Sequence, residues 1–340
     1  MLLKEKAEEI PGHDVRRRSL LIAGTGKSYG FERPPNKGGK TMYDIAVIGA
    51  GPAGVSAAIY GASRGKTVLV LEQEAVGGVI GKVSTVTHYA GILESETGRS
   101  FAARLKRQTE KSGVKLVYER VTGVRLKGEV KKIFTEGHVY EAGRVILANG
   151  TTPNRLNIPG EEELTGLGMN MNAARDGEQY RGRHVYVVGG ADGAVKEAIY
   201  LSGLAEKVTV LHFEETLGAI SEFQQKVKAA GNIEVKLHTR LTAVAGKGRI
   251  EKLELTDVRD GSTFWREDPG CGVFVYVGAA PNTELYPELE LAEGYIPVND
   301  KMETELPGVY AVGDIRVKQV RQAATAVADG AIAAINAALF

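Results

Sequence analysis

Residues 44–72, DIAVIGAGPAGVSAAIYGASRGKTVLVLE, contain in order an apolar run, a glycine-rich turn, a stretch with helical spacing and a second apolar run. The runs at 44–48 and 67–71 are rich in β-branched residues and leucine, which favours buried strands. The stretch 55–64 between them has apolar residues at the spacing of a helix. The segment therefore predicts a strand, turn, helix and strand of the kind that builds parallel sheets covered by helices.

The same pattern returns 140 residues later, in residues 184–212. The two segments align without a gap and share nine identical residues. A second glycine turn, residues 189–194, again lies between an apolar run and a helical stretch. An internal duplication of this size indicates two units of one architecture. We therefore predict an α/β protein with two Rossmann-like, three-layer nucleotide-binding domains.

The composition is that of a folded soluble protein. The chain has 340 residues, of which 43% are hydrophobic and 25% charged, and its formal charge is only +1. Such a balanced charge gives no field that would attract nucleic acid or anionic lipid, so neither partner is expected. No apolar run reaches the roughly 18 residues of a membrane span, and the single Cys271 excludes an internal disulfide. We expect a cytoplasmic protein.

Two further features limit what the chain contains. Residues 1–41 carry nine basic and five acidic residues without an apolar period, and we expect a flexible N-terminal extension there. The six histidines are scattered, without the spacing of metal ligands, so no metal site is predicted.

The first glycine turn has the spacing of a dinucleotide-binding fingerprint. Gly49 permits the tight turn, Gly51 the close approach of a pyrophosphate, and Gly54 the packing of helix on strand. The following helix offers free backbone N–H groups and the positive end of its dipole to that pyrophosphate. Glu72, at the end of the next strand, is placed to accept hydrogen bonds from ribose hydroxyls.

Three further segments carry a family resemblance. They are the predicted strand and turn 145–150, the strand and Gly-Asp pair 308–314, and the Arg-Gln-Ala segment 321–326. With these motifs the chain, from Met42 to its C-terminus, resembles the low-molecular-weight thioredoxin reductases among the flavoproteins with two dinucleotide-binding domains. The resemblance implies an FAD cofactor, a homodimer, and a second domain inserted into the first.

The same resemblance implies domain boundaries. The FAD-binding domain would comprise residues 42–153 and 279–340, and an NAD(P)H-binding-like domain would comprise residues 154–278. The positions that the fingerprint and the resemblance assign to FAD binding are Gly49, Gly51, Pro52, Ala53, Gly54, Glu72, Gln73, Gly78, Val79, His88, Val121, Asn149, Gly150, Gly313, Asp314, Arg321, Gln322 and Ala323.

Two of the positions that the resemblance places at the flavin ring are altered. The family's Gly-Gly-Gln segment becomes Gly77-Gly78-Val79, and its flavin-contacting Asn falls on His88. An imidazole there could hydrogen-bond to the ring or donate a proton. A structural role for His88 stays equally open.

This chain lacks the two cysteines that form the redox-active site of the family. Where thioredoxin reductases have Cys-Ala-Thr-Cys followed by Asp-Gly, this chain has residues 172–177, with Asn172 and Arg175 in place of the cysteines. Thiol–disulfide exchange needs a thiolate, so dithiol chemistry is excluded at this site. Asp176 is expected to pair with Arg175 or Arg181, and Arg175 facing the flavin is the alternative. His88 and Arg175 are the candidate catalytic residues, and no others are assigned.

The second glycine turn departs from the fingerprint as well. Ala191 places a methyl group where a pyrophosphate would approach, and Asp192 places a carboxylate nearby. Residues 212–218 lack the arginines with which NADPH-using relatives bind the 2′-phosphate, and Glu214 would repel it. NADPH is therefore disfavoured, and NADH stays open as a cofactor.

We interpret the chain as an FAD-dependent oxidoreductase without dithiol chemistry at the usual site. The preferred hypothesis is flavin-mediated electron transfer with a protein partner such as ferredoxin or flavodoxin. Basic residues could form a docking face for an acidic partner, although a solvated helix face explains them too; they are Arg99, Arg104, Lys106, Arg107 and Lys111. The alternatives are an NADH-dependent flavin oxidoreductase acting on a small acceptor, and a non-enzymatic flavoprotein, either a redox sensor or a remnant.

Overall fold

The computed structural model describes residues 42–339, and the expected N-terminal extension lies outside them. The first strand, β1 (Met42–Ile48), shows why this chain builds a sheet buried on both faces. Ile45 and Val47 belong to one buried apolar cluster, whereas Ala46 and Ile48 belong to another. Since successive side chains of a strand point to opposite faces, both faces of the sheet must be covered.

A seven-stranded sheet forms around β1, with the order β3-β2-β1-β6-β5-β4 and with β17 also paired to β6. The strands that join β1 in it are β2 (Val68–Glu72), β3 (Lys115–Tyr118), β4 (Val121–Arg125), β5 (Lys131–Thr135), β6 (Val139–Leu147) and β17 (Val309–Ala311). The long β6 pairs with the antiparallel β5 along its first half and with the parallel β17 along its second half. The ends of β1, β2, β6 and β17 therefore meet at one edge.

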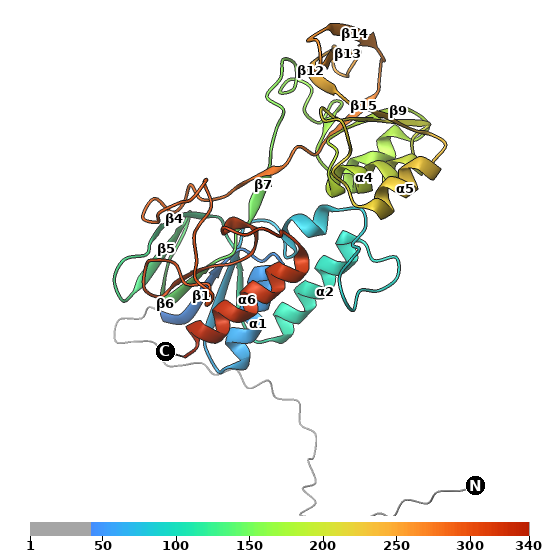
Figure 1. Cartoon of the computed structure of the whole chain (residues 1–340). Coiled ribbons are helices and arrows are strands. Elements are labelled where there is room, and N and C mark those ends of the chain that lie inside the picture. The colour runs from blue at the N-terminus through green and yellow to red at the C-terminus, as the bar shows by residue number, and fades with distance from the viewer. Residues whose placement is uncertain (1–41, 340) are drawn as a thin grey trace, which may run out of the picture. The chain divides into compact units, whose positions relative to one another are not determined.

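One face of this sheet is covered by three helices, α1 (Pro52–Ser63), α2 (Gly98–Lys111) and α6 (Ala323–Ala337). The helices α1 and α6 lie side by side (Figure 1), and the hydroxyl of Ser56 donates to the carbonyl of Val327 at 2.7 Å. A helix from the far end of the chain is thus packed directly on the helix that follows the first glycine turn.

The second sheet has five parallel strands in the order β11-β10-β9-β15-β8. Its strands are β8 (Met169–Asn170), β9 (His184–Val188), β10 (Lys207–Leu211), β11 (Ile233–Lys236) and β15 (Gly272–Val275). The helices of this part of the chain are α3 (Ala173–Asp176), α4 (Asp192–Ser202) and α5 (Ser221–Ala229). The duplicated units predicted from the sequence are thus β1-α1-β2 and β9-α4-β10.

A three-stranded antiparallel sheet packs on one face of the second sheet. It consists of β12 (Thr239–Ala245), β13 (Lys252–Asp257) and β14 (Thr263–Glu267). Two short strands, β7 (Thr151–Pro153) and β16 (Ala279–Pro281), pair antiparallel where the chain leaves the first sheet and returns to it. The second Rossmann-like unit is therefore inserted into the first. None of the helices within residues 42–339 is long and apolar enough to cross a lipid bilayer.

Candidate functional site

The first glycine turn connects β1 to α1 at the edge where the parallel strands end. Gly49 has a φ of +101°, and a Cβ there would lie 2.5 Å from the carbonyl oxygen of Ala148, so only glycine fits. Gly51 caps α1 in extended conformation, and a Cβ built on it meets no atom of the described part of the chain within 4 Å. A Cβ on Gly54 would overlap the carbonyl oxygen of Gly49. The open space beside Gly51, at a helix N-terminus, suits an anionic ligand.

The carboxylate of Glu72 and a further glycine, Gly78, lie beside this turn. Glu72 accepts from the backbone N–H of Ala50 at 2.8 Å through Oε2, and from that of Glu74 at 2.9 Å through Oε1. The carboxylate therefore supports the turn, and its proposed ribose contact would use the remaining lone pairs. Gly78 faces Gly51, because a Cβ on Gly78 would lie 3.2 Å from the Cα of Gly51.

The Gly-Asp pair after β17 lies against the start of α1. Gly313 has a φ of +76°, and a Cβ on it would lie 3.1 Å from the Cβ of Ala53. Oδ1 of Asp314 is buried without a hydrogen-bond partner among residues 42–339. Burial raises the pKa of Asp314, while the charges of Lys318 and Arg321 oppose that rise. A buried acceptor without a donor is what a site for a hydroxyl-bearing ligand requires.

Other predicted cofactor residues have partners within the protein. The side chain of Asn149 donates to the carbonyl of Asn282 at 2.9 Å and accepts from the hydroxyl of Tyr286 at 2.6 Å. Gln322 is the N-cap of α6, and the guanidinium of Arg321 lies 4.2 Å from the centre of the Tyr295 ring. These residues shape the edge of the sheet around the glycine turn.

The residues present fit FAD on three observations. As far as the described residues show, the N-terminus of α1 is open beside Gly51, Gly78 faces it without a side chain, and Asp314 offers an unpaired buried acceptor. Phosphate oxygens, close backbone approach and a donor hydroxyl are the features of a dinucleotide that would use them. No group of three or more His, Cys, Asp and Glu side chains that could hold a metal ion occurs in the described part of the chain.

Val79 and His88, the two altered positions expected at the flavin ring, and Val121, another position assigned to FAD binding, differ in their surroundings. Val79 is half exposed, whereas Val121 is buried. His88 has a φ of +57°, and its Nε2 lies 3.0 Å from Oε2 of Glu222 on α5. The imidazole is therefore engaged by a carboxylate, and its contact with a flavin stays a prediction.

The segment that replaces the dithiol forms a capped turn of helix. The side chain of Asn172 accepts from the backbone N–H of Arg175 at 2.9 Å, which caps α3. Arg175 binds Asp176 through two hydrogen bonds of 2.7 and 2.8 Å, while Arg181 pairs with Glu178 instead. Of the two partners expected for Asp176, the first is confirmed.

Cys271 cannot replace the missing dithiol. Cys271 is 2% exposed and packs in the core between the second sheet and the three-stranded sheet. Burial raises the pKa of this thiol strongly, so the reactive thiolate is disfavoured. The prediction that Cys271 is a packing residue is confirmed.

The second glycine turn is arranged differently from the first. Ala191 is the N-cap of α4 with extended backbone, so the position tolerates a side chain and the methyl group only restricts a ligand. Asp192 accepts from the backbone N–H of Ile220 at 2.8 Å, so one oxygen of its carboxylate is occupied. The ring of His212 fills the space over Gly190, and its Nε2 lies 3.1 Å from Oε2 of Glu214.

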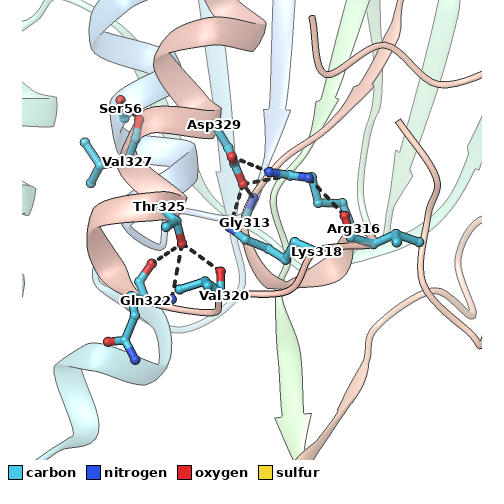
Figure 2. A network of polar contacts seen from close by, with 10 residues as sticks. Ser56, Gly313, Arg316, Lys318, Val320, Gln322, Thr325, Val327 and Asp329 are labelled. Carbon is cyan, nitrogen blue, oxygen red and sulfur yellow. Dashed lines mark hydrogen bonds and ion pairs between the residues drawn. The ribbon is translucent and has the colours of Figure 1, made fainter. Parts of the chain in front are cut away.

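Two features of the site were not found from the sequence. The guanidinium of Arg240 lies 4.6 Å from the centre of the Phe213 ring and brings a cation from β12 to the end of β10. Asp329 of α6 accepts hydrogen bonds from Gly313, Arg316 and Lys318 (Figure 2). Asp329 is the only charged residue of α6. A single acidic residue in an otherwise apolar helix is the sequence pattern that could have indicated a buried, partnered carboxylate.

The fold and these motifs define a class of protein. A family model described as pyridine nucleotide-disulphide oxidoreductase matches residues 43–330, and the chain belongs to this family. It is an FAD-dependent oxidoreductase with the architecture of a thioredoxin reductase. The predicted fold class and family resemblance are thus confirmed.

Particular thioredoxin reductases are similar over most of their length. That of Peptoclostridium acidaminophilum is 38% identical over 304 residues, which cover 88% of this chain and 96% of the relative. The crystal structure of Lactococcus lactis thioredoxin reductase, in its FR conformation, has a TM-score of 0.83 at 34% identity and covers 87% and 97% of the two chains. The T. acidophilum thioredoxin reductase structure also has a TM-score of 0.83, at 30% identity, with 88% and 98% covered.

Proposed function

We propose that this protein transfers electrons between FAD and a protein redox partner such as ferredoxin or flavodoxin, without dithiol exchange. One observation carries the proposal: the two dithiol positions hold Asn172 and Arg175, and the single cysteine is buried in a core. The usual route from a flavin to a disulfide substrate therefore has no sulfur relay.

The chain's own residues would bind and orient the cofactor. Backbone N–H groups at the start of α1 would bind the pyrophosphate beside Gly51. Asp314 would accept from a hydroxyl of the nucleotide. When bound, FAD supplies the one- and two-electron chemistry that no side chain provides.

The α2 helix offers the proposed docking face. Arg104 pairs with the buried Glu96 and is removed from that face. Lys106 lies 3.8 Å from Glu110, whereas Arg107 and Lys111 are exposed. The remaining excess of positive charge supports steering of an acidic partner rather than tight binding.

An NADH-dependent flavin oxidoreductase acting on a small acceptor is the second candidate. It is supported by Glu214, whose carboxylate follows β10 beside His212, where a ribose diol would be bound. Glu214 disfavours the 2′-phosphate of NADPH, although Arg240 brings a cation close to this position. We keep the preference for NADH over NADPH as part of this proposal.

We further propose a cytoplasmic homodimer, as the likeness to thioredoxin reductases implies. The proposed FAD-binding domain comprises residues 42–153 and 279–340, and residues 154–278 form the second domain. The pairing of β7 with β16 supports these boundaries.

An anaerobic reduction experiment tests the function. We expect reduced ferredoxin to bleach the flavin absorbance faster than NADH, and NADH to bleach it faster than NADPH. Arg107→Glu combined with Lys111→Glu should slow bleaching by ferredoxin and weaken its salt dependence, whereas Lys301→Glu, on an exposed loop, should not. Fast bleaching by NADPH contradicts the proposal, and bleaching by none of the three favours a redox sensor or a remnant.

A further inference from the structure

A buried cluster of charges lies beside Gly313, the first residue of the Gly-Asp pair (Figure 2). Asp329, 3% exposed, accepts from Nε and one terminal nitrogen of Arg316 at 2.9 and 2.7 Å. It also accepts from Nζ of Lys318 at 2.8 Å and from the backbone N–H of Gly313 at 3.1 Å. The cluster therefore fixes the backbone turn that presents Asp314.

The charges of this cluster do not cancel. Arg316 and Lys318 contribute two positive charges against the single negative charge of Asp329. The Lys318 side chain is only 4% exposed, so water does not screen its ammonium group effectively. A buried excess of one positive charge is costly unless an anion lies nearby.

Asp314 is the nearby group that can supply this anion. Its buried Oδ1 has no hydrogen-bond partner within the described range 42–339, and the charges of Lys318 and Arg321 act on its carboxyl group. The first turn of α1, which packs against Gly313, carries no charged side chain. Among residues 42–339, Lys318, Arg321 and Asp329 are thus the charged groups that act on Asp314.

We propose that Lys318 is a positioning residue that keeps Asp314 ionised, so that its buried oxygen can accept a hydrogen bond from the flavin nucleotide. This inference rests on the proposed binding of FAD. Hydrogen bonds to an ionised acceptor are stronger than those to a neutral one, so the ionised carboxylate holds the cofactor more tightly. Burial raises the pKa of Asp314, and the Lys318 ammonium group limits that rise.

The affinity of the apoprotein for FAD, measured at pH 8 and pH 6, tests this role. Wild-type affinity should change little over this range. Lys318→Gln should bind FAD within about threefold of wild type at pH 8 and more weakly at pH 6, because loss of the ammonium group raises the pKa of Asp314 further and affinity falls by up to about tenfold for each unit by which that pKa exceeds the pH. Lys318→Arg, which retains the charge, should restore the wild-type profile.

Matched variants separate this role from a merely structural one. Asp314→Asn should weaken binding equally at both pH values, and adding Lys318→Gln to it should introduce no pH dependence. Should Lys318→Gln fail to fold, Arg316→Gln leaves the negative charge of Asp329 less neutralised, and since that charge raises the pKa of Asp314, this variant should weaken binding at pH 6 in the same direction. Unchanged affinity at both pH values in every folded variant that loses a cation overturns the inference. A wild-type chain that binds no FAD overturns the proposed function itself.

Discussion

Cys271 has surroundings that suppress its thiol chemistry. It is 2% exposed, and burial raises its pKa, so both access and ionisation disfavour reaction. We expect native protein to react with a thiol reagent such as DTNB more than about 100-fold slower than denatured protein, because reaction requires local opening. In guanidinium chloride one thiol per chain should react.

Cys271→Ala provides the control for that measurement. The variant should show no reaction in either state and should retain FAD binding and flavin reduction, since the thiol contributes only packing. Rapid stoichiometric labelling of native wild type would reopen thiol chemistry for this protein.

The residue scale also shows what the sequence could predict about the site. The steric roles of Gly49 and Gly54 follow from spacing alone, because each depends on local backbone geometry that the fingerprint encodes. The bonds from Arg316 and Lys318 to Asp329 join a loop to α6 across 11 or more positions of the sequence. Such contacts depend on tertiary packing, which no local pattern records.

At the scale of elements, the close contact between α1 and α6 depends on Gly330. A Cβ on Gly330 would overlap the carbonyl oxygen of Ala53 and lie 3.0 Å from the backbone nitrogen of Ala57. Gly330→Val must therefore separate the two helices and should destabilise the fold by about 1–3 kcal/mol. Displacement of the α1 N-terminus should also weaken FAD binding. Urea unfolding and FAD titration measure the two effects.

Ala328→Val is the matched control on the same helix. Ala328 is exposed, so valine there changes helix propensity without changing the contact between α1 and α6. The substitution should lower the free energy of unfolding by less than about 1 kcal/mol and leave FAD affinity unchanged. Equal effects of the two substitutions would show that propensity, and not the contact with α1, determines the result.

Elements differ in how far the sequence predicts them. The strand β9 (His184–Val188) begins and ends where the apolar pattern places it, because four consecutive buried positions after His184 leave little ambiguity. The helix α1 begins at Pro52 rather than at the expected Val55, since its first turn lies within the glycine motif itself. The three-stranded sheet β12–β14 was not predicted, because its strands are partly exposed and their polar residues weaken the apolar signal.

At the scale of the whole molecule, the single tryptophan offers a probe of one sheet only. Trp265 lies on β14, in the three-stranded sheet that packs on the second parallel sheet, and Nζ of Lys252 lies 4.8 Å from the centre of its ring. Flavin fluorescence, by contrast, reports on the site at the first glycine turn. The two signals can therefore follow the two Rossmann-like units independently.

Removal and addition of cofactors should then affect the two signals differently. FAD at 100 times its dissociation constant should stabilise the unit that binds it by about 2.7 kcal/mol and raise the temperature of flavin release. The Trp265 transition should move little, because FAD contacts are proposed only for residues 42–153 and 279–340.

Saturating NADH should shift the Trp265 transition if residues 154–278 bind it, and Glu214→Gln should reduce that shift. Thermal unfolding of apoprotein and FAD-loaded protein, followed through both signals, measures these effects. A single transition that FAD shifts equally in both signals would instead show that the two units unfold cooperatively and that their separate assignment has no thermodynamic basis.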